Sequence, residues 1–349
     1  MTGGVGPARP PGPTSTSSPG PAPDAAGLGA GLACALAAGL AWGLVFVAPV
    51  MLPDYPAAVL SVGRYLAFGL IALALAWPAR EALARLTRAD WVEAARLSLV
   101  GNLVYYACLA AAIQTAGVPL PTMLIGTLPV VIAVVSNLSE RTLPWRRLAP
   151  SLATIAAGIV LVNQAELARL RETEPDAGPR LALGALLALG AVACWTWYPI
   201  RNARWMQRNP GSSSATWATA QGLTTLPLAL AGALALAAWH AASPLADASG
   251  RPFEMPLGPR PLEFVLLMAA IGLAASWLGT LLWNRASRLL PTSLAGQLIV
   301  FETLAALAYG FLWRGAPPSG GAVAGIALLV AGVAVGVRTF QRGPLESAH

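Results

Sequence analysis

Two charged side chains stand inside long apolar runs of the sequence. Glu302 lies about ten residues into the run 292–313, and Arg64 is the seventh residue of the run 58–77. A helix rises 1.5 Å per residue, so these positions are roughly 15 Å and about 10 Å from the ends of a membrane helix. A charge at the bilayer centre costs about 2.5–3.5 kcal/mol on insertion scales, and such residues by default carry function. We predict that Glu302 takes up and releases a proton or binds an amine, and that Arg64 binds a carboxylate or phosphate.

Each of these residues also has a structural interpretation. Glu302 could be a protonated acid that is hydrogen-bonded across helices, or a fixed partner for an arginine. Arg64 could extend along its own helix so that its guanidinium reaches the membrane surface, as long basic side chains near helix ends do. The sequence leaves both alternatives open.

Further polar and aromatic residues are candidates for the same binding site. Asn102, Tyr105 and Tyr106 fall within about one helical turn, and Gln297 precedes Glu302 by five residues. Trp42 lies deeper in its run than an interfacial aromatic residue would. We predict that these residues bind substrate together with Arg64 and Glu302. Hydrogen bonding between helices is the alternative for the polar ones.

A second aromatic group, Trp195, Trp197 and Tyr198, is close to the predicted end of its run. Aromatic side chains gather at membrane interfaces, so an interfacial belt is the first interpretation. A stacking surface for a flat substrate is the second.

The composition is that of a membrane protein. The chain is 56% hydrophobic and 11% charged, whereas soluble proteins carry about 25% charged residues. Its net charge of +7 comes from arginines scattered among short loops, which favours a role in membrane orientation over nucleic-acid binding. Cys34, Cys108 and Cys194 lie in apolar runs without a CxxC pair, so we expect no disulfide and no metal site. We expect no cofactor either.

Hydropathy divides the chain into ten predicted crossings between two short tails. Residues 1–27 are rich in proline, glycine and serine and are predicted to be disordered, and residues 339–349 form a short C-terminal tail. An apolar run of about 20 residues spans a bilayer, which gives an all-α polytopic fold. The ten runs are 28–50, 58–77, 95–115, 118–137, 148–165, 181–200, 214–239, 264–284, 292–313 and 320–338.

Loop arginines predict the orientation, because cytoplasmic loops carry the excess of positive charge. One predicted side holds most of them, together with both tails, so both termini are predicted to be cytoplasmic. The richer side carries Arg80, Arg85, Arg88, Arg96, Arg141, Arg146, Arg147, Arg201, Arg204, Arg208, Arg285 and Arg288, and the other side carries Arg169, Arg171, Arg180, Arg251, Arg260 and Arg314.

The two ends of the chain also resemble each other. Gly158 and Gly332 stand 174 residues apart in the similar triplets AAG and VAG, and the same shift superposes 128–130 on 302–304. Five crossings per half is an odd number, so the second half must enter the membrane the opposite way up. We predict two inverted five-helix repeats, 28–166 and 181–338, an architecture common among secondary transporters.

Short motifs spread over 28–338 make the chain similar to the drug/metabolite transporter superfamily, in its EamA-like branch. The motifs are Ala41-Trp42-Gly43, Arg64-Tyr65, Leu128-Pro129-Val130, Glu140-Arg141, Leu282-Trp283-Asn284-Arg285-Ala286, Leu290-Pro291-Thr292-Ser293 and Phe301-Glu302. Two positions depart from the pattern: Thr303 stands where a proline is usual and Arg314 where a glutamate is usual. The resemblance implies ten helices around a central cavity and alternating access for small polar solutes.

The function that we predict is secondary transport, as an exporter of small polar or amphiphilic metabolites across the bacterial plasma membrane. The sequence contains no GxxxxGK[ST] loop for nucleotide binding. A lipid flippase or a non-transporting assembly factor is the alternative. An intramembrane enzyme is disfavoured, because the two histidines lie at a helix end and at the last residue and no HExxH or GxSxG motif occurs in a span.

The predicted partners are a small-molecule substrate and the lipid bilayer, with protons as the coupling ion. The glycine pairs 321/325 and 332/336 give the last span a small-residue face for close helix packing. This face leaves a homodimer open.

Overall fold

The computed structural model describes residues 25–46, 51–116, 119–140, 143–173, 178–246, 250–315 and 320–342. Four predicted features lie wholly or partly outside these residues. They are the N-terminal tail, the end of the first crossing at 47–50, the turn near Gly117 and the C-terminal tail. Residues 25–27, predicted to belong to the tail, are the start of the first helix.

Ten helices of the described residues are long and apolar enough to cross a membrane, which confirms the predicted all-α polytopic fold. Large apolar side chains cover the outside of the bundle, including Leu70, Leu186, Leu234 and Leu266, each more than half exposed. Such a surface is unfavourable in water and suits a lipid environment.

The first five spans follow one another along the chain. They are α1 (Ala25–Gly43), α3 (Ala57–Ala76), a composite of α5 (Arg88–Ser98), η2 (Leu99–Val104) and α6 (Tyr105–Ala116), a pair of half-helices α7 (Pro119–Ile125) and α8 (Leu128–Glu140), and α9 (Trp145–Thr173). Two short elements, η1 (Leu44–Phe46) and α4 (Arg80–Ala84), lie between spans.

The last five spans repeat this order of continuous and interrupted helices. They are α10 (Gly178–Arg208), α11 (Ser214–Ala242), a composite of α12 (Pro261–Ile271), η3 (Gly272–Leu278) and α13 (Gly279–Leu289), the half-helices α14 (Thr292–Leu298) and α15 (Val300–Arg314), and α16 (Gly320–Arg342). Several spans are longer than predicted, because α10 continues to Arg208 and α13 to Leu289 as amphipathic ends beyond the apolar run.

Four interruptions fall at matching places in the two halves. The π-helical turns η2 and η3 occupy the third and eighth spans, and the 174-residue shift places Asn102 of η2 on Ser276 of η3. The fourth and ninth spans break after Ile125 and at Ile299, again 174 residues apart. The positions of these interruptions therefore agree with a repeated unit, and hydropathy alone does not predict them.

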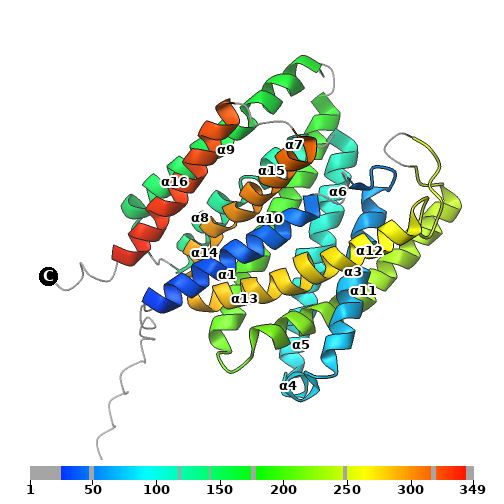
Figure 1. The fold of residues 1–349 in the computed structure, drawn as a ribbon, viewed down its shortest axis with the longest axis horizontal. Helices are drawn as coiled ribbons and strands as arrows, with labels where there is room; N and C mark the ends of the chain where they lie inside the picture. The colour runs from blue at the N-terminus through cyan, green and yellow to red at the C-terminus, as the bar shows by residue number, and fades with distance from the viewer. Residues whose placement is uncertain are drawn as a thin grey trace, which may run out of the picture.

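The first span of each half packs mainly on spans of the other half. The first span, α1, packs on α13 and α15, while α10, the first span of the second half, packs on α6, α7 and α8. Three further pairs of spans meet their counterparts directly, because α3 packs on α11, α8 on α14 and α9 on α16. Figure 1 shows α9 and α16 side by side at one edge of the bundle. The two halves are interleaved, which is consistent with an inverted repeat.

Glycines make these contacts close. A Cβ on Gly158 would lie 2.8 Å from the carbonyl oxygen of Gly325, and one on Gly332 would lie 2.9 Å from the backbone nitrogen of Ile155. The small-residue face of α16 is therefore used within the chain, against α9.

Candidate functional site

The predicted charged residues meet in the middle of the bundle. Arg64 on α3 and Glu302 on α15 are within range of direct charge interaction, and both act electrostatically on Tyr105 of α6. Tyr65 and Tyr106 belong to the same group, and their rings meet edge to face with centroids 6.4 Å apart. Elements that are distant in sequence thus bring Arg64, Glu302, Tyr105 and Tyr106 together, as a common site requires.

Helix breaks and close packing place Glu302. It lies in the first turn of α15, directly after the break at Ile299, with its backbone nitrogen bonded to the carbonyl of Ile299 at 2.9 Å. A Cβ on Gly39 of α1 would lie 2.5 Å from the Cβ of Phe301 and 2.9 Å from the backbone nitrogen of Glu302. Discontinuous helices that meet near the midplane form the binding sites of many secondary transporters.

Arg64 points into the bundle rather than toward the membrane surface. Its Nε donates to the Ser276 hydroxyl at 3.0 Å, and its guanidinium carbon lies 5.2 Å from the centroid of the Tyr65 ring. Ser276 is buried in the π-turn η3. The structure therefore gives no support to an outward-extended Arg64.

An aromatic wall lies beside this charged group. The Trp195 ring stacks on Tyr105 and on Tyr198, each at a centroid distance of 5.0 Å, and meets Trp42 edge to face at 5.7 Å. Trp42 also contacts Trp283 at 5.3 Å. The wall therefore comes from α1, α6, α10 and α13, and it joins Trp42 to the charged group through Trp195 and Tyr105.

The aromatic residues of the sixth span divide into two kinds. Trp195 and Tyr198 belong to the aromatic wall, which favours the interpretation as a stacking surface, whereas Trp197 is 36% exposed, as an interfacial residue would be. Neither Trp195 nor Tyr198 was among the predicted substrate-binding residues. Their three-residue spacing on a helix is the sequence signal for a shared face.

Two predicted residues have other partners. Asn102, in the π-turn η2, is half-buried and donates from Nδ2 to the Thr225 hydroxyl of α11 at 3.2 Å, at the border of the site. Gln297 lies apart: it is buried between α14, α9 and α16, where its Oε1 accepts from the Ser151 hydroxyl at 2.8 Å. The break at Ile299 separates Gln297 from Glu302, so helical spacing no longer relates their directions.

Pro129 is also explained by a break. It is the second residue of the half-helix α8, where its missing N–H would have no helical acceptor. A new half-helix starts there, after the break that follows Ile125.

A buried amide network closes one end of the bundle below the aromatic wall. The Oδ1 of Asn202 accepts from Trp217 Nε1 at 2.9 Å and from Gln221 Nε2 at 3.1 Å, and its Nδ2 donates to Asn284 Oδ1 at 2.8 Å. Tyr198 donates its hydroxyl proton to Gln221 Oε1 at 2.9 Å, which links the network to the wall. We call Asn202, Trp217, Gln221, Asn284 and Tyr198 the amide network.

Ion pairs surround this end. Arg201 of α10 forms a forked pair with Glu93 of α5, with nitrogen–oxygen distances of 2.5 and 3.1 Å. Arg204 lies 3.5 Å from Glu140 at the end of α8. These contacts join the ends of spans that were predicted to lie on the arginine-rich side.

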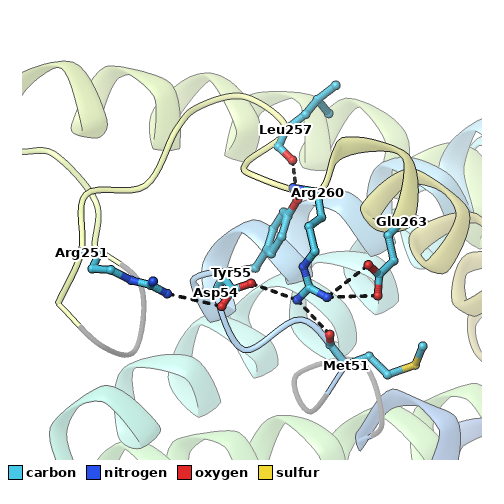
Figure 2. Close-up of polar contacts among 7 residues, drawn as sticks. All are labelled: Met51, Asp54, Tyr55, Arg251, Leu257, Arg260 and Glu263. Carbon is cyan, nitrogen blue, oxygen red and sulfur yellow. Dashed lines mark hydrogen bonds and ion pairs between the residues drawn. The ribbon is translucent and has the colours of Figure 1, made fainter.

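A charged loop cluster lies at the opposite end, since α11 runs from the amide network to the loop residues 243–246 and 250–260 (Figure 1). Arg260 is its centre, with nitrogens 3.1 Å from Asp54, 3.1 Å from Glu263 and 3.0 Å from the carbonyl oxygen of Met51 (Figure 2). Arg251 approaches Asp54 at 3.5 Å. These contacts tie the loop between the first two spans to the loop before the eighth.

Tyr55 and two phenylalanines fill the space next to the ion pairs. The Tyr55 hydroxyl donates to the carbonyl of Leu257 at 2.7 Å and accepts from the backbone nitrogen of Arg260 at 2.9 Å. Its ring stacks on Phe264 at 5.0 Å and meets Phe253 at 5.2 Å. Burial raises the pKa of the Tyr55 phenol, so it stays a hydrogen-bond donor. We call Met51, Asp54, Tyr55, Arg251, Leu257, Arg260 and Glu263 the loop cluster.

Within the described residues, no group of three or more His, Cys, Asp and Glu side chains could hold a metal ion.

Known proteins match the chain over most of its length. Residues 29–164 match the EamA-like transporter family. The chain is 50% identical over 312 residues to the inner membrane protein YtfF of Escherichia coli strain K12, which covers 88% of this chain and 94% of that protein. A solved structure, titled only as the crystal structure of a protein, aligns with a TM-score of 0.64 at 20% identity over 91% of this chain and 99% of its own. That structure shows the same fold.

Proposed function

The chain belongs to the EamA-like transporter family, and from this premise we propose that it is a secondary transporter that exports small amphiphilic metabolites by alternating access. The observation that carries the proposal is that Arg64 and Glu302 lie within range of charge interaction beside an aromatic wall, where interrupted spans of both halves meet. Both charges lie deep in the bundle, where an isolated charge would be costly.

The chemistry of the site indicates the solute. Arg64 offers a fixed positive charge, Glu302 a negative or protonated carboxyl group, and Tyr105 and Trp195 a flat apolar surface. A small molecule with an anionic group and a planar apolar part satisfies all three. In this proposal Glu302 carries the coupling proton, since protonation would remove its attraction to Arg64 and change the charge that the solute meets.

Alternating access assigns roles to the two closed ends. The amide network and the loop cluster seal opposite ends of the same site. Release on either side requires one of them to separate while the other stays closed. The richer content of arginine near the amide network supports a cytoplasmic location for that end, with the loop cluster outside.

A metabolite profile of cells that lack the protein and cells that overproduce it identifies candidate solutes. Proteoliposomes then measure solute counterflow and flux driven by a pH gradient, with lipid scrambling measured in parallel. We expect Glu302→Gln to abolish gradient-driven flux and to keep counterflow, because counterflow needs no net proton movement. Unchanged gradient-driven flux in this variant would show that Glu302 is not the coupling group. Scrambling without solute flux would instead favour the lipid flippase.

A further inference from the structure

The two π-helical turns hold equivalent bonds across the halves. In η3, the Ser276 hydroxyl accepts from Arg64 of α3 at 3.0 Å. In η2, Asn102, which the 174-residue shift places on Ser276, donates to Thr225 of α11 at 3.2 Å. The second span of each half thus bonds to the π-turn of the other half. Single π-helical turns inside α-helices are frequent at functional sites.

The two bonds differ in what they hold. Thr225 is a neutral side chain, whose hydroxyl also donates to the carbonyl of Gln221 at 2.8 Å. Arg64 is charged, and the bond engages only its Nε. Among the described residues its two terminal nitrogens form no hydrogen bond, although Glu302 lies within range of charge interaction.

Packing against η3 fixes the direction of the Arg64 side chain. A Cβ on Gly272 would lie 2.8 Å from the Cβ of Ala67, and one on Gly63 would lie 2.6 Å from the Phe264 ring and 3.0 Å from Met268. Gly63 is therefore level with the middle of α12, and Ala67 is level with the start of η3. To reach Ser276, Arg64 extends beyond Gly272 along the span, away from the loop cluster and toward the aromatic wall.

We infer that Ser276 is a positioning residue for anion binding: its hydroxyl holds the Nε of Arg64 so that the two terminal nitrogens face the site as a fork for a carboxylate or another planar anionic group. A guanidinium binds a carboxylate through two parallel N–H···O bonds only when its plane is correctly oriented. The Tyr65 ring limits rotation by lying 5.2 Å from the guanidinium carbon. This inference deepens the proposed function, and it rests on the same site.

The test follows Arg64 by its reaction with phenylglyoxal, a reagent that attacks guanidinium groups, with modified peptides quantified by mass spectrometry. The probes are 3-phenylpropionate, which has a carboxylate and a flat ring, and 3-phenylpropionamide, which has the same shape without the charge. In the wild-type protein we expect the carboxylate to protect Arg64 and the amide to protect it weakly. Protection measures binding at Arg64 whether or not transport occurs.

Three variants separate positioning from packing. Ser276→Ala removes the hydroxyl, and we expect the half-protecting concentration of 3-phenylpropionate to rise about tenfold, as loss of an oriented fork would cause. Ser276→Thr keeps a hydroxyl and should bind like the wild type. Thr225→Val removes the hydroxyl from the equivalent bond in the other half, where no arginine is held, and should leave the preference for the carboxylate over the amide unchanged.

The outcomes distinguish this inference from the proposed function. Equal protection by the two probes in the wild type, or an unchanged half-protecting concentration in Ser276→Ala, would overturn the positioning role. If Thr225→Val lost the carboxylate preference as fully as Ser276→Ala, both bonds would serve only to hold the two halves together, and the positioning role would be overturned. Protection that follows the expected pattern while proteoliposomes show no solute flux would keep the anion site and refute transport.

Discussion

The amide network and the loop cluster close the two ends of one bundle by different means. Asn202 and Asn284 of the amide network are fully buried, and every polar atom of the Asn202 side chain has a partner on another span. In the loop cluster, the side chains of Arg260 and Asp54 are 35% and 33% exposed. Water and salt can replace exposed ion pairs, but they cannot reach a buried amide without first opening the bundle.

This difference in burial indicates which of the two ends of the bundle separates more easily. An exposed ion pair contributes about 0–1 kcal/mol, whereas a buried polar group left without its partner costs about 1–3 kcal/mol. We therefore expect the closed form described here to open at the loop cluster before it opens at the amide network. On the predicted topology, that is the outer face.

The largest effect is expected from Asn202→Ala. The substitution removes one acceptor and one donor and leaves Trp217, Gln221 and Asn284 with unpaired buried groups, so the free energy of unfolding should fall by about 3–5 kcal/mol. Thermal or chemical unfolding in detergent measures it. Asn163→Ala is the matched control, because within the described part of the chain the Asn163 amide donates only to a carbonyl of its own helix, that of Ile159 at 2.9 Å. Equal losses in the two variants would show that the network does not hold its end together.

A smaller loss of stability and a larger change in access are expected from Arg260→Gln. The variant should lower the free energy of unfolding by about 1–2 kcal/mol, because its partners are partly hydrated already. The measurement uses a protein whose three cysteines are replaced by alanine and which also carries Tyr106→Cys. The rate at which this new cysteine reacts with a membrane-impermeant maleimide reports access to the site. Labelling from the loop-cluster side should become several times faster, and labelling from the other side should not change. Acceleration from both sides would contradict the comparison.

The sequence predicted the ten spans and the central charges for one physical reason. Apolar runs must cross the bilayer, and Arg64 and Glu302 inside such runs must find polar surroundings. Tyr105 and Tyr106 were proposed as site residues because they follow Asn102 within about a turn. These inferences need only local sequence and the cost of burying charge.

What the sequence could not predict depends on breaks and on distant partners. The π-turns and the breaks at Ile125 and Ile299 lie inside long, mostly apolar runs, and no change of periodicity marks them. Gln297 was placed by helical spacing that the break at Ile299 interrupts. Ser276 is one small residue in an apolar span, and only its contact with Arg64, 212 residues away, shows its role.

The finest test of the comparison removes one oxygen from each of two tyrosines. Tyr55→Phe deletes a hydroxyl that both donates to Leu257 and accepts from the backbone of Arg260, and its raised pKa keeps the donor proton in place at neutral pH. The free energy of unfolding should fall by about 0.5–1.5 kcal/mol, the usual range for a hydrogen bond. Tyr309→Phe is the control, because the Tyr309 hydroxyl makes one exposed bond, to the carbonyl of Leu40 at 3.0 Å, and should cost less. If Tyr55→Phe instead lowered the free energy of unfolding as much as Asn202→Ala, the loop cluster would hold its end as firmly as the amide network holds the other. The expectation that the loop-cluster end opens first would then be wrong.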